Sequence, residues 1–346
     1  MKAIMISDAR KMVVTQVPEP EVGDNTVKVR VARCGICGTD LAARSSSLPR
    51  WHVGCVLGHE VVGEIDEVGA AVQNWSPGDR VALSMGSPCG ACQTCRAGRG
   101  FLCIHHLDRA LGHGVVQGGY ASHIVVSPEL LHHIPDHLSF DQAAIAEPLA
   151  IAIHGVNRSN VRPGDPVAIL GAGPIGALTA AALRARGVDD IVLVDPNAAR
   201  RALMGPAGFV AVDLAGCEES VPAALGGRSP EFIFECTSHL SAPGKAVELA
   251  AYGARIVLQG VPKAPVQVSQ YLVVQKELEL VGSASCNHRD MEEAISHLAA
   301  GRVRAEDFVT AVVPLEQANE MFDALLDPAG SHLKVLLAPN LPAPVN

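Results

Sequence analysis

The stretch PVAILGAGPIGALTAAALRARGVDDIVLVD (166–195) decides the fold of this chain. An apolar run (166–170) leads through a glycine-rich turn into an alanine-rich segment (174–186), and a second apolar run (191–195) follows Gly187. Alanine favours helix, glycine commonly ends one, and short apolar runs bounded by turns are typical of buried strands. The stretch therefore predicts a strand, a helix and a parallel second strand, which is the βαβ unit of a doubly wound α/β sheet.

The turn, GAGPIG, fills the pattern GxGxxG between a strand and a helix, the context in which that pattern binds a dinucleotide. The first glycine permits a tight turn, the second lets backbone N–H groups approach a pyrophosphate, and the third lets the helix pack on the strand. The helix N-terminus favours negative charge. The predicted contacts are Gly171, Gly173, Pro174, Ile175 and Gly176. The alternative is a glycine-rich turn that holds no ligand.

Cofactor choice depends on Asp195, the acidic residue at the end of the second strand. A carboxylate at this place accepts hydrogen bonds from the adenosine ribose and repels a 2′-phosphate, so we expect NAD rather than NADP. Arg200 is a further predicted cofactor contact. Arg200 and Arg201 keep NADP possible as well, because a guanidinium binds phosphate well.

The rest of the chain falls into two parts that differ in predicted secondary structure. Apolar runs at 232–237, 254–260 and 278–283, with a helical pattern at 241–253, extend the α/β sheet. Before about residue 150, short β-rich runs alternate with Gly- and Pro-marked turns, which predicts a twisted, mostly antiparallel β domain. Beyond about residue 288 we expect two helices and a strand at 332–338.

Composition narrows the class of partner. With 346 residues, of which 48% are hydrophobic, the chain exceeds one ordinary core, so two domains are expected. Its 36 acidic and 27 basic residues give a net charge of −9, which repels a nucleic-acid backbone. No segment approaches the roughly 18 apolar residues of a membrane span, and the N-terminus carries no signal-peptide pattern. We expect a cytoplasmic protein with a small-molecule partner and no nucleic-acid or membrane partner.

Four cysteines lie close together in CGACQTCRAGRGFLC (89–103). They are Cys89, Cys92, Cys95 and Cys103. Four thiolates can close a tetrahedron around zinc and leave no open position, so this cluster predicts a structural zinc site. Five histidines near the cluster and after it have no ligand spacing and are expected to be solvated. They are His105, His106, His113, His132 and His133.

A second cysteine pair, Cys34 and Cys37 in CGICGTD (34–40), is ambiguous by itself. Two cysteines at this spacing form a redox dithiol, half of a zinc site, or one ligand beside a packed thiol. A catalytic zinc needs about three protein ligands and a vacant position. Outside the four-cysteine cluster, the candidates are Cys37, His59, Glu60 and Glu147.

CGICGTD, GHE, the four-cysteine cluster, EPLA and GxGxxG, in this order, resemble the zinc-dependent medium-chain dehydrogenases, the group of alcohol, polyol and threonine dehydrogenases. The resemblance spans nearly the whole chain. It implies a GroES-like twisted β catalytic domain over 1–150 with a zinc lobe at about 86–106, and a Rossmann NAD-binding domain over 151–288. It also implies a C-terminal segment over 289–346 that returns to the catalytic domain.

The resemblance assigns the metal ligands. Cys37 is implied to be the zinc thiolate, His59 the imidazole ligand and Glu147 the carboxylate ligand, although in polyol dehydrogenases a water separates that carboxylate from the metal. Glu60 resembles a residue that either binds zinc or stays just outside its coordination shell. Cys34 then becomes a packed strand thiol. Two zinc ions per chain are expected, one catalytic and one structural.

The resemblance also suggests a proton path with one departure. Asp40 resembles the carboxylate that orients the ligating histidine, and Thr39 the hydroxyl that accepts the alcohol proton. A helix-capping threonine is the alternative reading. Many members have histidine five positions after the ligand cysteine, but this chain has Ala42. The proton must then leave by water or by another side chain, for which His52 and Arg44 are the candidates, though each fits a surface role better.

By the same resemblance, a set of residues at strand ends should line the nicotinamide site. They are Thr237, Gly260, Val261, Ser283 and Ala284. Ordinary strand ends are the alternative, although the carboxyl edge of such a sheet is where ligands bind.

The sequence thus predicts a zinc-dependent, NAD-linked oxidation of a secondary alcohol, a polyol or a related polyhydroxylated molecule, to a ketone by hydride transfer. A threonine 3-dehydrogenase is the first alternative, favoured by CGTDL and opposed by Ala42. A zinc-free quinone or enone reductase does not need Cys37, His59 and Glu147, and a non-catalytic dinucleotide-binding protein needs no ligand set either. The resemblance implies a homodimer or homotetramer.

Overall fold

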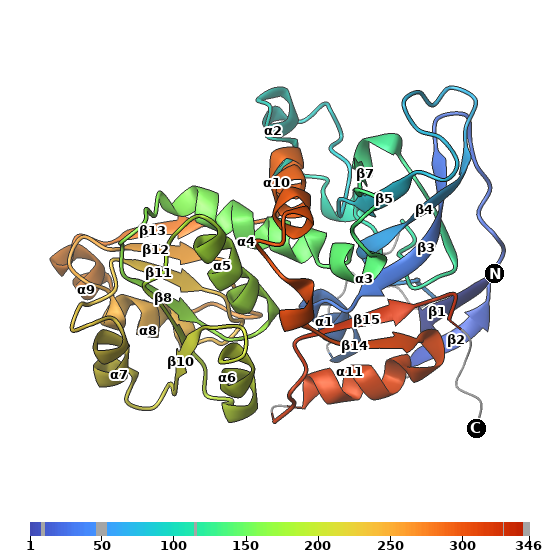
Figure 1. The fold of residues 1–346 in the computed structure, drawn as a ribbon. Coiled ribbons are helices and arrows are strands. Elements are labelled where there is room, and N and C mark those ends of the chain that lie inside the picture. The colour runs from blue at the N-terminus through green and yellow to red at the C-terminus, as the bar shows by residue number, and fades with distance from the viewer. Residues whose placement is uncertain (8–10, 46–53, 114–115, 328, 342–346) are drawn as a thin grey trace. The chain divides into compact units, whose positions relative to one another are not determined.

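The computed structural model describes residues 1–7, 11–45, 54–113, 116–327 and 329–341 (Figure 1). These residues form two compact units. Met1–Glu147, Asn287–Asp327 and the described residues from Lys334 onward make the first unit. Pro148–Cys286 and the described part of Pro328–Leu333 make the second. The chain therefore passes from the first unit to the second and back twice.

The second unit is built on one six-stranded sheet with the order β10-β9-β8-β11-β12-β13, in which every pairing is parallel. The strands are β8 (Val167–Leu170), β9 (Ile191–Val194), β10 (Val210–Val212), β11 (Phe232–Glu235), β12 (Arg255–Leu258) and β13 (Glu279–Gly282). The strand order turns back between β8 and β11, which is the switch point where doubly wound sheets bind ligands. The predicted doubly wound parallel sheet is confirmed.

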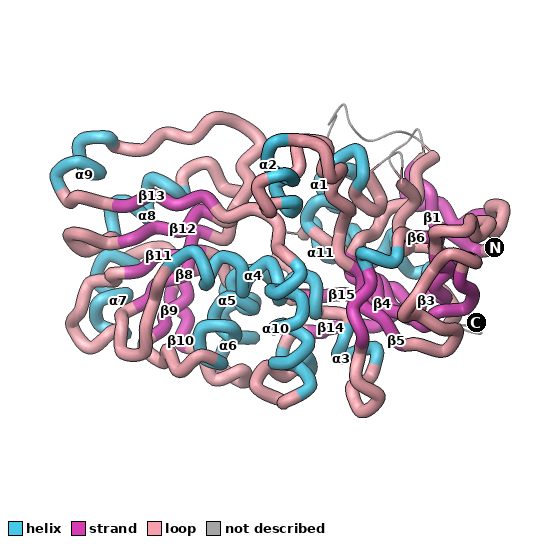
Figure 2. The backbone as a smooth tube through the Cα atoms, turned by 90° about the horizontal axis from the view of Figure 1, so that it is seen from above, coloured by secondary structure: helices cyan, strands magenta, loops and turns pink. Residues whose placement is uncertain are grey.

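Helices cover both faces of this sheet (Figures 1 and 2). One face carries α5 (Pro174–Ala185) and α6 (Ala198–Met204), and the other carries α7 (Cys217–Ala224) and α8 (Ala242–Leu249). The helix α9 (Gln270–Gln275) packs beside α8. Because both faces are covered, β8 and β9 are apolar and buried at every position.

The first unit contains a seven-stranded sheet with the order β14-β15-β3-β4-β5-β7, to which β6 adds by pairing with β3. The strands are β3 (Val27–Gly35), β4 (Glu60–Val68), β5 (Arg80–Leu83), β6 (His123–Val126), β7 (Leu131–His133), β14 (Val309–Pro314) and β15 (Lys334–Ala338). All pairings are antiparallel except that of β14 with β15. The mostly antiparallel β domain is confirmed.

The remaining elements of the first unit surround its core. The hairpin β1 (Lys2–Ile6) and β2 (Met12–Gln16) forms a separate two-stranded sheet. The helices are α1 (Gly38–Ser45), α2 (Gln93–Arg96), α3 (Phe140–Ala143), α10 (His288–Ala299) and α11 (Ala318–Leu326), and α4 (Ala146–Ser159) leads into the second unit. In the core, Tyr120 and Phe322 make an edge-to-face contact with centroids 6.3 Å apart. None of the helices in the described ranges has the length and apolarity that a membrane crossing requires.

Candidate active site and metal centres

The segment CGICGTD joins β3 to α1 and fixes the thiol of Cys37 at the junction. The strand ends at Gly35 and the helix begins at Gly38, so Cys37 lies between them. The Asp40 carboxylate Oδ2 accepts the backbone N–H of Cys37 at 3.0 Å and the hydroxyl of Tyr120 at 2.7 Å. The buried Asp40 therefore holds the backbone of this turn and ties it to the core of the first unit.

The segment GHE brings the second and third donors from the start of β4. His59 and Glu60 are 3% and 1% exposed. Gly58 precedes them with φ of +94°, and a Cβ there would lie 2.6 Å from the Tyr120 ring. A side chain at this position would be strained and would clash, so the turn that presents His59 requires glycine.

One ligand atom from each of Cys37, His59 and Glu60 lies within 4.8 Å of the other two. Thiolate, imidazole and carboxylate are the donors that zinc takes in open sites, where about three protein ligands leave one position vacant. In the same place, Nδ1 of His59 and Oδ1 of Asp40 are buried and have no hydrogen-bond partner in the described structure. The donor set and the unsatisfied buried nitrogen both fit a bound metal ion.

Electrostatics at this cluster favour a cation. Burial alone would lower the pKa of His59, but the Cys37 sulfur, Asp40 and Glu147 overcome that effect and raise it to about 10. A buried imidazole that gains a proton so readily lies in a strongly negative environment. A metal ion would neutralise the same negative charge.

Lys334 is a further member of the site that the sequence did not reveal. Its Nζ donates to both carboxylate oxygens of Glu60 at 2.7 Å and to the carbonyl of Ile36 at 3.0 Å. Its side chain is 3% exposed, so this is a buried ion pair. The close approach also depends on Gly35, because a Cβ there would lie 2.0 Å from Oε2 of Glu60. Lysine within the apolar run HLKVLLA was the available signal.

Glu147 lies near these groups but outside the set of three. It is 5% exposed in the first turn of α4 and is absent from the group whose donors lie within 4.8 Å. Burial raises its pKa to about 7, with a smaller effect in the same direction from Glu60 and opposing effects from His59 and Lys334. These mutual effects place Glu147 in the same electrostatic environment. Its role as a ligand stays a prediction.

The residues of the predicted proton path differ in their surroundings in the structure. Oδ2 of Asp40 binds the Cys37 N–H and Tyr120, and its Oδ1 makes no hydrogen bond to His59 among the described residues, so its role in orienting His59 stays a prediction. Thr39 is exposed in the first turn of α1. Arg44 is held by Asp323 at 2.5 Å and by the carbonyl of Asn319, which gives it a structural role. His52 lies outside the described residues.

The four-cysteine cluster forms a compact group of sulfurs around α2. The Sγ atoms lie 3.4 Å apart for Cys92 and Cys95, and 3.9 Å apart both for Cys89 and Cys95 and for Cys92 and Cys103. Tetrahedral zinc with Zn–S bonds of about 2.3 Å places its sulfurs about 3.8 Å apart. The spacing therefore fits a closed tetrahedral site.

Donors lower the pKa of two of the four thiols, Cys89 and Cys92, whereas desolvation and the Cys92 sulfur raise the pKa of Cys95 to about 12. The hydroxyl of Thr94 lies 3.1 Å from the Cys92 sulfur and, with the N–H groups of Cys95 and Ile104, lowers the pKa of Cys92 to about 5. The backbone N–H of Cys92 donates to the Cys89 sulfur at 3.3 Å, and that of Cys89 to the Cys103 sulfur at 3.4 Å. Such N–H···S bonds are the surroundings that a metal-bound thiolate needs.

In the second unit, the phosphate loop has the backbone that GxGxxG predicts. Gly171 follows β8 with φ of +100°, and Gly173 caps α5. A Cβ on Gly176 would lie 1.9 Å from the carbonyl oxygen of Gly171, so the third glycine is required for the helix to approach. Pro174 and Ile175 occupy the first turn of α5. The N–H groups of a helix N-terminus favour an anion, and of these two residues only Ile175 has one.

Asp195 and Arg200 meet at this loop. Asp195 follows β9, and its two oxygens accept the N–H groups of Ala172 and Asn197, each at 2.8 Å. A carboxylate offers about four acceptor sites, which leaves acceptor capacity for ribose hydroxyls. The Arg200 Nη1 lies 4.0 Å from a Cβ placed on Gly173, and its buried Nε has no partner in the described structure. Arg201 is instead held by Asp213 and by two backbone carbonyls.

The predicted nicotinamide contacts all follow strands at the carboxyl edge of this sheet. Thr237 follows β11, the pair Gly260 and Val261 follows β12, and the pair Ser283 and Ala284 follows β13. The Thr237 methyl group packs on Gly171 so closely that a Cβ added to Gly171 would lie 2.8 Å from the methyl carbon. Val261 is 78% exposed. These assignments remain predictions.

One of the five histidines expected to be solvated is buried, and another lies beside the candidate site. His132 is 4% exposed and its Nε2 lies 2.8 Å from the Ser84 hydroxyl, so the expectation of solvation was wrong for this residue. The His113 ring lies 5.8 Å from that of His59, beside the candidate site. The spacing gave no signal for this contact, because β4, β5 and α2 lie between the two histidines in the chain.

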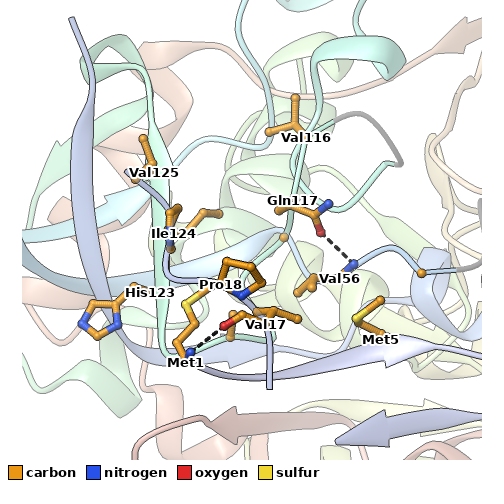
Figure 3. A pocket seen from close by; sticks show the side chains of 14 residues that line it. Met1, Met5, Val17, Pro18, Val56, Val116, Gln117, His123, Ile124 and Val125 are labelled. Atoms are coloured by element: carbon orange, nitrogen blue, oxygen red, sulfur yellow. Dashed lines mark hydrogen bonds between the residues drawn. The ribbon is translucent and has the colours of Figure 1, made fainter. Parts of the chain in front are cut away.

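A separate apolar cavity of about 510 Å³ lies in the first unit (Figure 3). Its walls include Met1, Met5, Val17 and Ile124, and the N-terminal ammonium donates to the carbonyl of Val17 at 2.6 Å. Among the described residues that line it, none is a predicted metal ligand or cofactor contact. The cavity therefore does not belong to the candidate site.

Comparison with known proteins gives consistent matches. Residues 23–136 match the alcohol dehydrogenase GroES-like domain, and residues 174–300 match the zinc-binding dehydrogenase family. A sorbitol dehydrogenase of Bacillus subtilis (strain 168) is 28% identical over 98% of both chains. An (R,R)-butanediol dehydrogenase of Neisseria gonorrhoeae is 30% identical over 99% of this chain and 100% of its own. A zinc-binding dehydrogenase of Sinorhizobium meliloti 1021 bound to NADP superposes with a TM-score of 0.89, with 29% identity over 98% of this chain and 99% of its own.

Proposed function

The chain belongs to the zinc-type medium-chain dehydrogenases, and from this premise we propose that it oxidises a secondary alcohol to a ketone with NAD as hydride acceptor. The proposed substrate is a polyol or a related small polyhydroxylated molecule, in keeping with the sorbitol and butanediol dehydrogenases among its relatives. The observation that carries the proposal is the buried cluster of Cys37, His59 and Glu60, with donor atoms within 4.8 Å of one another.

Zinc bound at this cluster would act as a Lewis acid that favours loss of the alcohol proton near neutral pH. Cys37 and His59 would hold the ion, with Glu60 or Glu147 as the third ligand. Asp40 keeps the Cys37 backbone in place through the hydrogen bond at 3.0 Å. Thr39 is the proposed acceptor of the hydroxyl proton, since its exposed hydroxyl lies two residues from Cys37. With Ala42 in place of the usual histidine, that proton would pass to water.

Lys334 neutralises the charge of Glu60 through a buried ion pair. As long as the ammonium pairs with both carboxylate oxygens at 2.7 Å, Glu60 is neutralised without a metal. A Glu60 carboxylate held in this way leaves a coordination position open for the alcohol. This ion pair supports Glu60 as the outer carboxylate. Glu147, which lies outside the group of three donors, is then the proposed carboxylate ligand.

For the cofactor we propose NAD, because Asp195 places a carboxylate where a 2′-phosphate would lie. Arg200 beside the phosphate loop works in the opposite direction, and a relative of known structure binds NADP. The test is Asp195→Ala, with affinities for NAD and NADP measured by calorimetry. Weaker binding of NAD and unchanged or tighter binding of NADP is expected, whereas an unchanged preference would show that the ribose argument is wrong.

The proposed assembly is a homodimer or homotetramer. The strand β13 is the outer strand of the six-stranded sheet among the described residues, and its row of backbone groups is available for pairing. Exposed apolar side chains lie near this edge, namely Leu280, Tyr271, Val274 and Val261. Sedimentation of the wild type and of Leu280→Lys tests the proposal. A monomeric wild type would refute it.

An NAD-linked substrate screen tests the proposed reaction. NADH production from sorbitol-like polyols and vicinal diols is expected, and turnover with L-threonine alone would favour the threonine dehydrogenase alternative. No NAD reduction across a broad alcohol panel, with zinc present and NAD binding intact, would favour a non-catalytic dinucleotide-binding protein. All ten cysteines are reduced thiols in the structure. Reduced thiols suit the reducing cytoplasm, which we propose as the location of this protein.

A further inference from the structure

Glu235 is a buried carboxylate that neither the metal site nor the phosphate loop accounts for. It is the last residue of β11, the strand next to the switch point, and it is 1% exposed. Among the described residues, no ion pair includes it. Burying an unpaired carboxylate is strongly unfavourable unless backbone or side-chain donors satisfy it. Its neighbours in the strand are Ile233 and Phe234, so packing alone would favour an apolar residue here.

The donors that satisfy Glu235 come from two different loops. Its Oε1 accepts the backbone N–H of Thr237 at 2.8 Å and the Thr237 hydroxyl at 2.6 Å. Its Oε2 faces Gly260, where a Cβ would lie only 2.5 Å away. Burial raises the pKa of Glu235, and the nearby donors of Thr237 and Gly260 oppose that rise. The backbone carbonyl of Glu235 accepts the N–H groups of Gln259 and Gly260, each at 2.9 Å. One residue therefore fixes the first turn after β11 and the first turn after β12.

Thr237 extends this connection to the phosphate loop. With its hydroxyl directed at Glu235, its methyl group packs on Gly171, the first glycine of the loop. The same hydroxyl accepts the backbone N–H of His239 at 3.1 Å. Three segments that approach the carboxyl edge of the sheet separately are thus joined through one carboxylate.

We propose that Glu235 is a positioning residue for the nicotinamide half of the dinucleotide, which sets the loops at Thr237 and Gly260 in their binding arrangement. This inference rests on the proposed NAD-linked function. Glu235 need not touch the cofactor, because it acts through Thr237 and Gly260. Its carboxylate is suited to this role since both oxygens are acceptors, and both loops present donors to it.

Glu235→Gln is the decisive variant. Glutamine has the same shape but only one acceptor oxygen, and its other terminal group is an NH₂ donor. That NH₂ group would meet the donors of either Thr237 or Gly260, and two donors cannot form a hydrogen bond. We expect NAD to bind about tenfold more weakly, while ADP-ribose, which lacks the nicotinamide, binds within about twofold of wild type. Thr237→Val keeps the branched shape that packs on Gly171 and removes only the hydroxyl, so a smaller change in the same direction is expected. Glu219→Gln, at an exposed position on α7, is the matched control and should bind both ligands as wild type does.

Calorimetry with NAD and ADP-ribose on the full chain separates the outcomes without any need for turnover. Equal NAD affinity in wild type and Glu235→Gln would overturn the inference, and so would an equal loss of NAD and ADP-ribose affinity, which indicates a general structural role. If Glu235→Gln does not fold, Thr237→Val decides, and wild-type NAD affinity in it contradicts the inference. A wild type that binds ADP-ribose but no NAD would instead contradict the proposed function.

Discussion

The two cysteine-containing clusters of the first unit differ in the properties that decide what a metal ion can do. The four-cysteine cluster consists of sulfurs 3.4 to 3.9 Å apart, drawn from fifteen consecutive residues, and it leaves no vacant position. The Cys37 cluster draws one sulfur, one imidazole and one carboxylate from separate segments and surrounds them with buried charge. Local spacing therefore suffices for a closed structural zinc site, whereas an open catalytic site requires ligands from segments that only the folded chain brings together.

The largest expected effect is that of Cys37→Ser. Loss of the thiolate should abolish zinc binding at this cluster and reduce kcat/KM by at least about a thousandfold, since a Lewis acid supplies several kcal/mol to such a reaction. The fold should survive, because Cys37 lies on a turn that Asp40 holds through the backbone. Enzyme kinetics and circular dichroism check both parts.

Cys34→Ala is the matched control for that experiment. Cys34 is a fully buried strand thiol at one end of the same motif, and burial raises its pKa well above that of an ordinary thiol. The variant should keep zinc and activity. Equal loss of activity in Cys37→Ser and Cys34→Ala would support a redox dithiol and would contradict the assignment of Cys37 to a catalytic zinc site.

Next in size is Lys334→Ala, which leaves Glu60 buried without its cation. Breaking a buried ion pair from one side typically lowers the free energy of unfolding by about 3–5 kcal/mol. The loss should be smaller in zinc-loaded protein, because a metal ion near Glu60 replaces the missing charge. Denaturant unfolding with and without zinc measures both values. The control is Lys2→Ala, which removes an exposed pair with Glu316 and should change stability by at most about 1 kcal/mol.

Cys95→Ser tests the other cluster. It should remove the structural zinc and lower Tm by roughly 10 °C, given that 1 kcal/mol shifts Tm by about 2–4 °C in a domain of this size. The kcat of the remaining folded protein should stay within about twofold of wild type. A selective loss of kcat with an unchanged Tm would reverse the roles assigned to the two clusters.

The smallest expected effect concerns pH. Burial raises the pKa of Glu147 to about 7 in the folded, metal-free protein, above the ordinary value of 4.5. The folded state then holds a proton that the unfolded state releases, so stability falls as pH rises from 4.5 to 7, by up to about 1.4 kcal/mol per pH unit. Glu147→Gln should flatten this decline in zinc-free protein. An unchanged slope would show that Glu147 ionises freely and lies away from the negative cluster.

The sequence predicted the features that depend on local pattern. The strands at 166–170, 191–195 and 232–237, the helix at 174–186 and the four-cysteine cluster all follow from periodicity, glycine placement and short spacing. The edge strand β10 was missed, because three residues in Val210–Val212 give too short a pattern.

The contacts that complete the candidate site could not be predicted, because they join segments far apart in the chain. Lys334 reaches Glu60 across 274 residues, and Tyr120 reaches Asp40 across 80. The pairing of β15 with β3 brings the first of these about, and no local pattern encodes which strands pair. The sequence also contained no sign that Oδ2 of Asp40 binds the Cys37 N–H and the Tyr120 hydroxyl, while the role of Asp40 in orienting His59 stays a prediction.

The zinc content and zinc-edge X-ray absorption spectrum of wild type and Cys37→Ser test whether Cys37, His59 and a carboxylate form an open metal site. The wild type should contain about two zinc ions per chain with mixed sulfur and nitrogen or oxygen ligands, and the variant about one, with four sulfur ligands at about 2.3 Å. A wild type with one all-sulfur zinc, or a variant that keeps two zinc ions, would contradict the assignment of Cys37, His59 and a carboxylate as an open metal site.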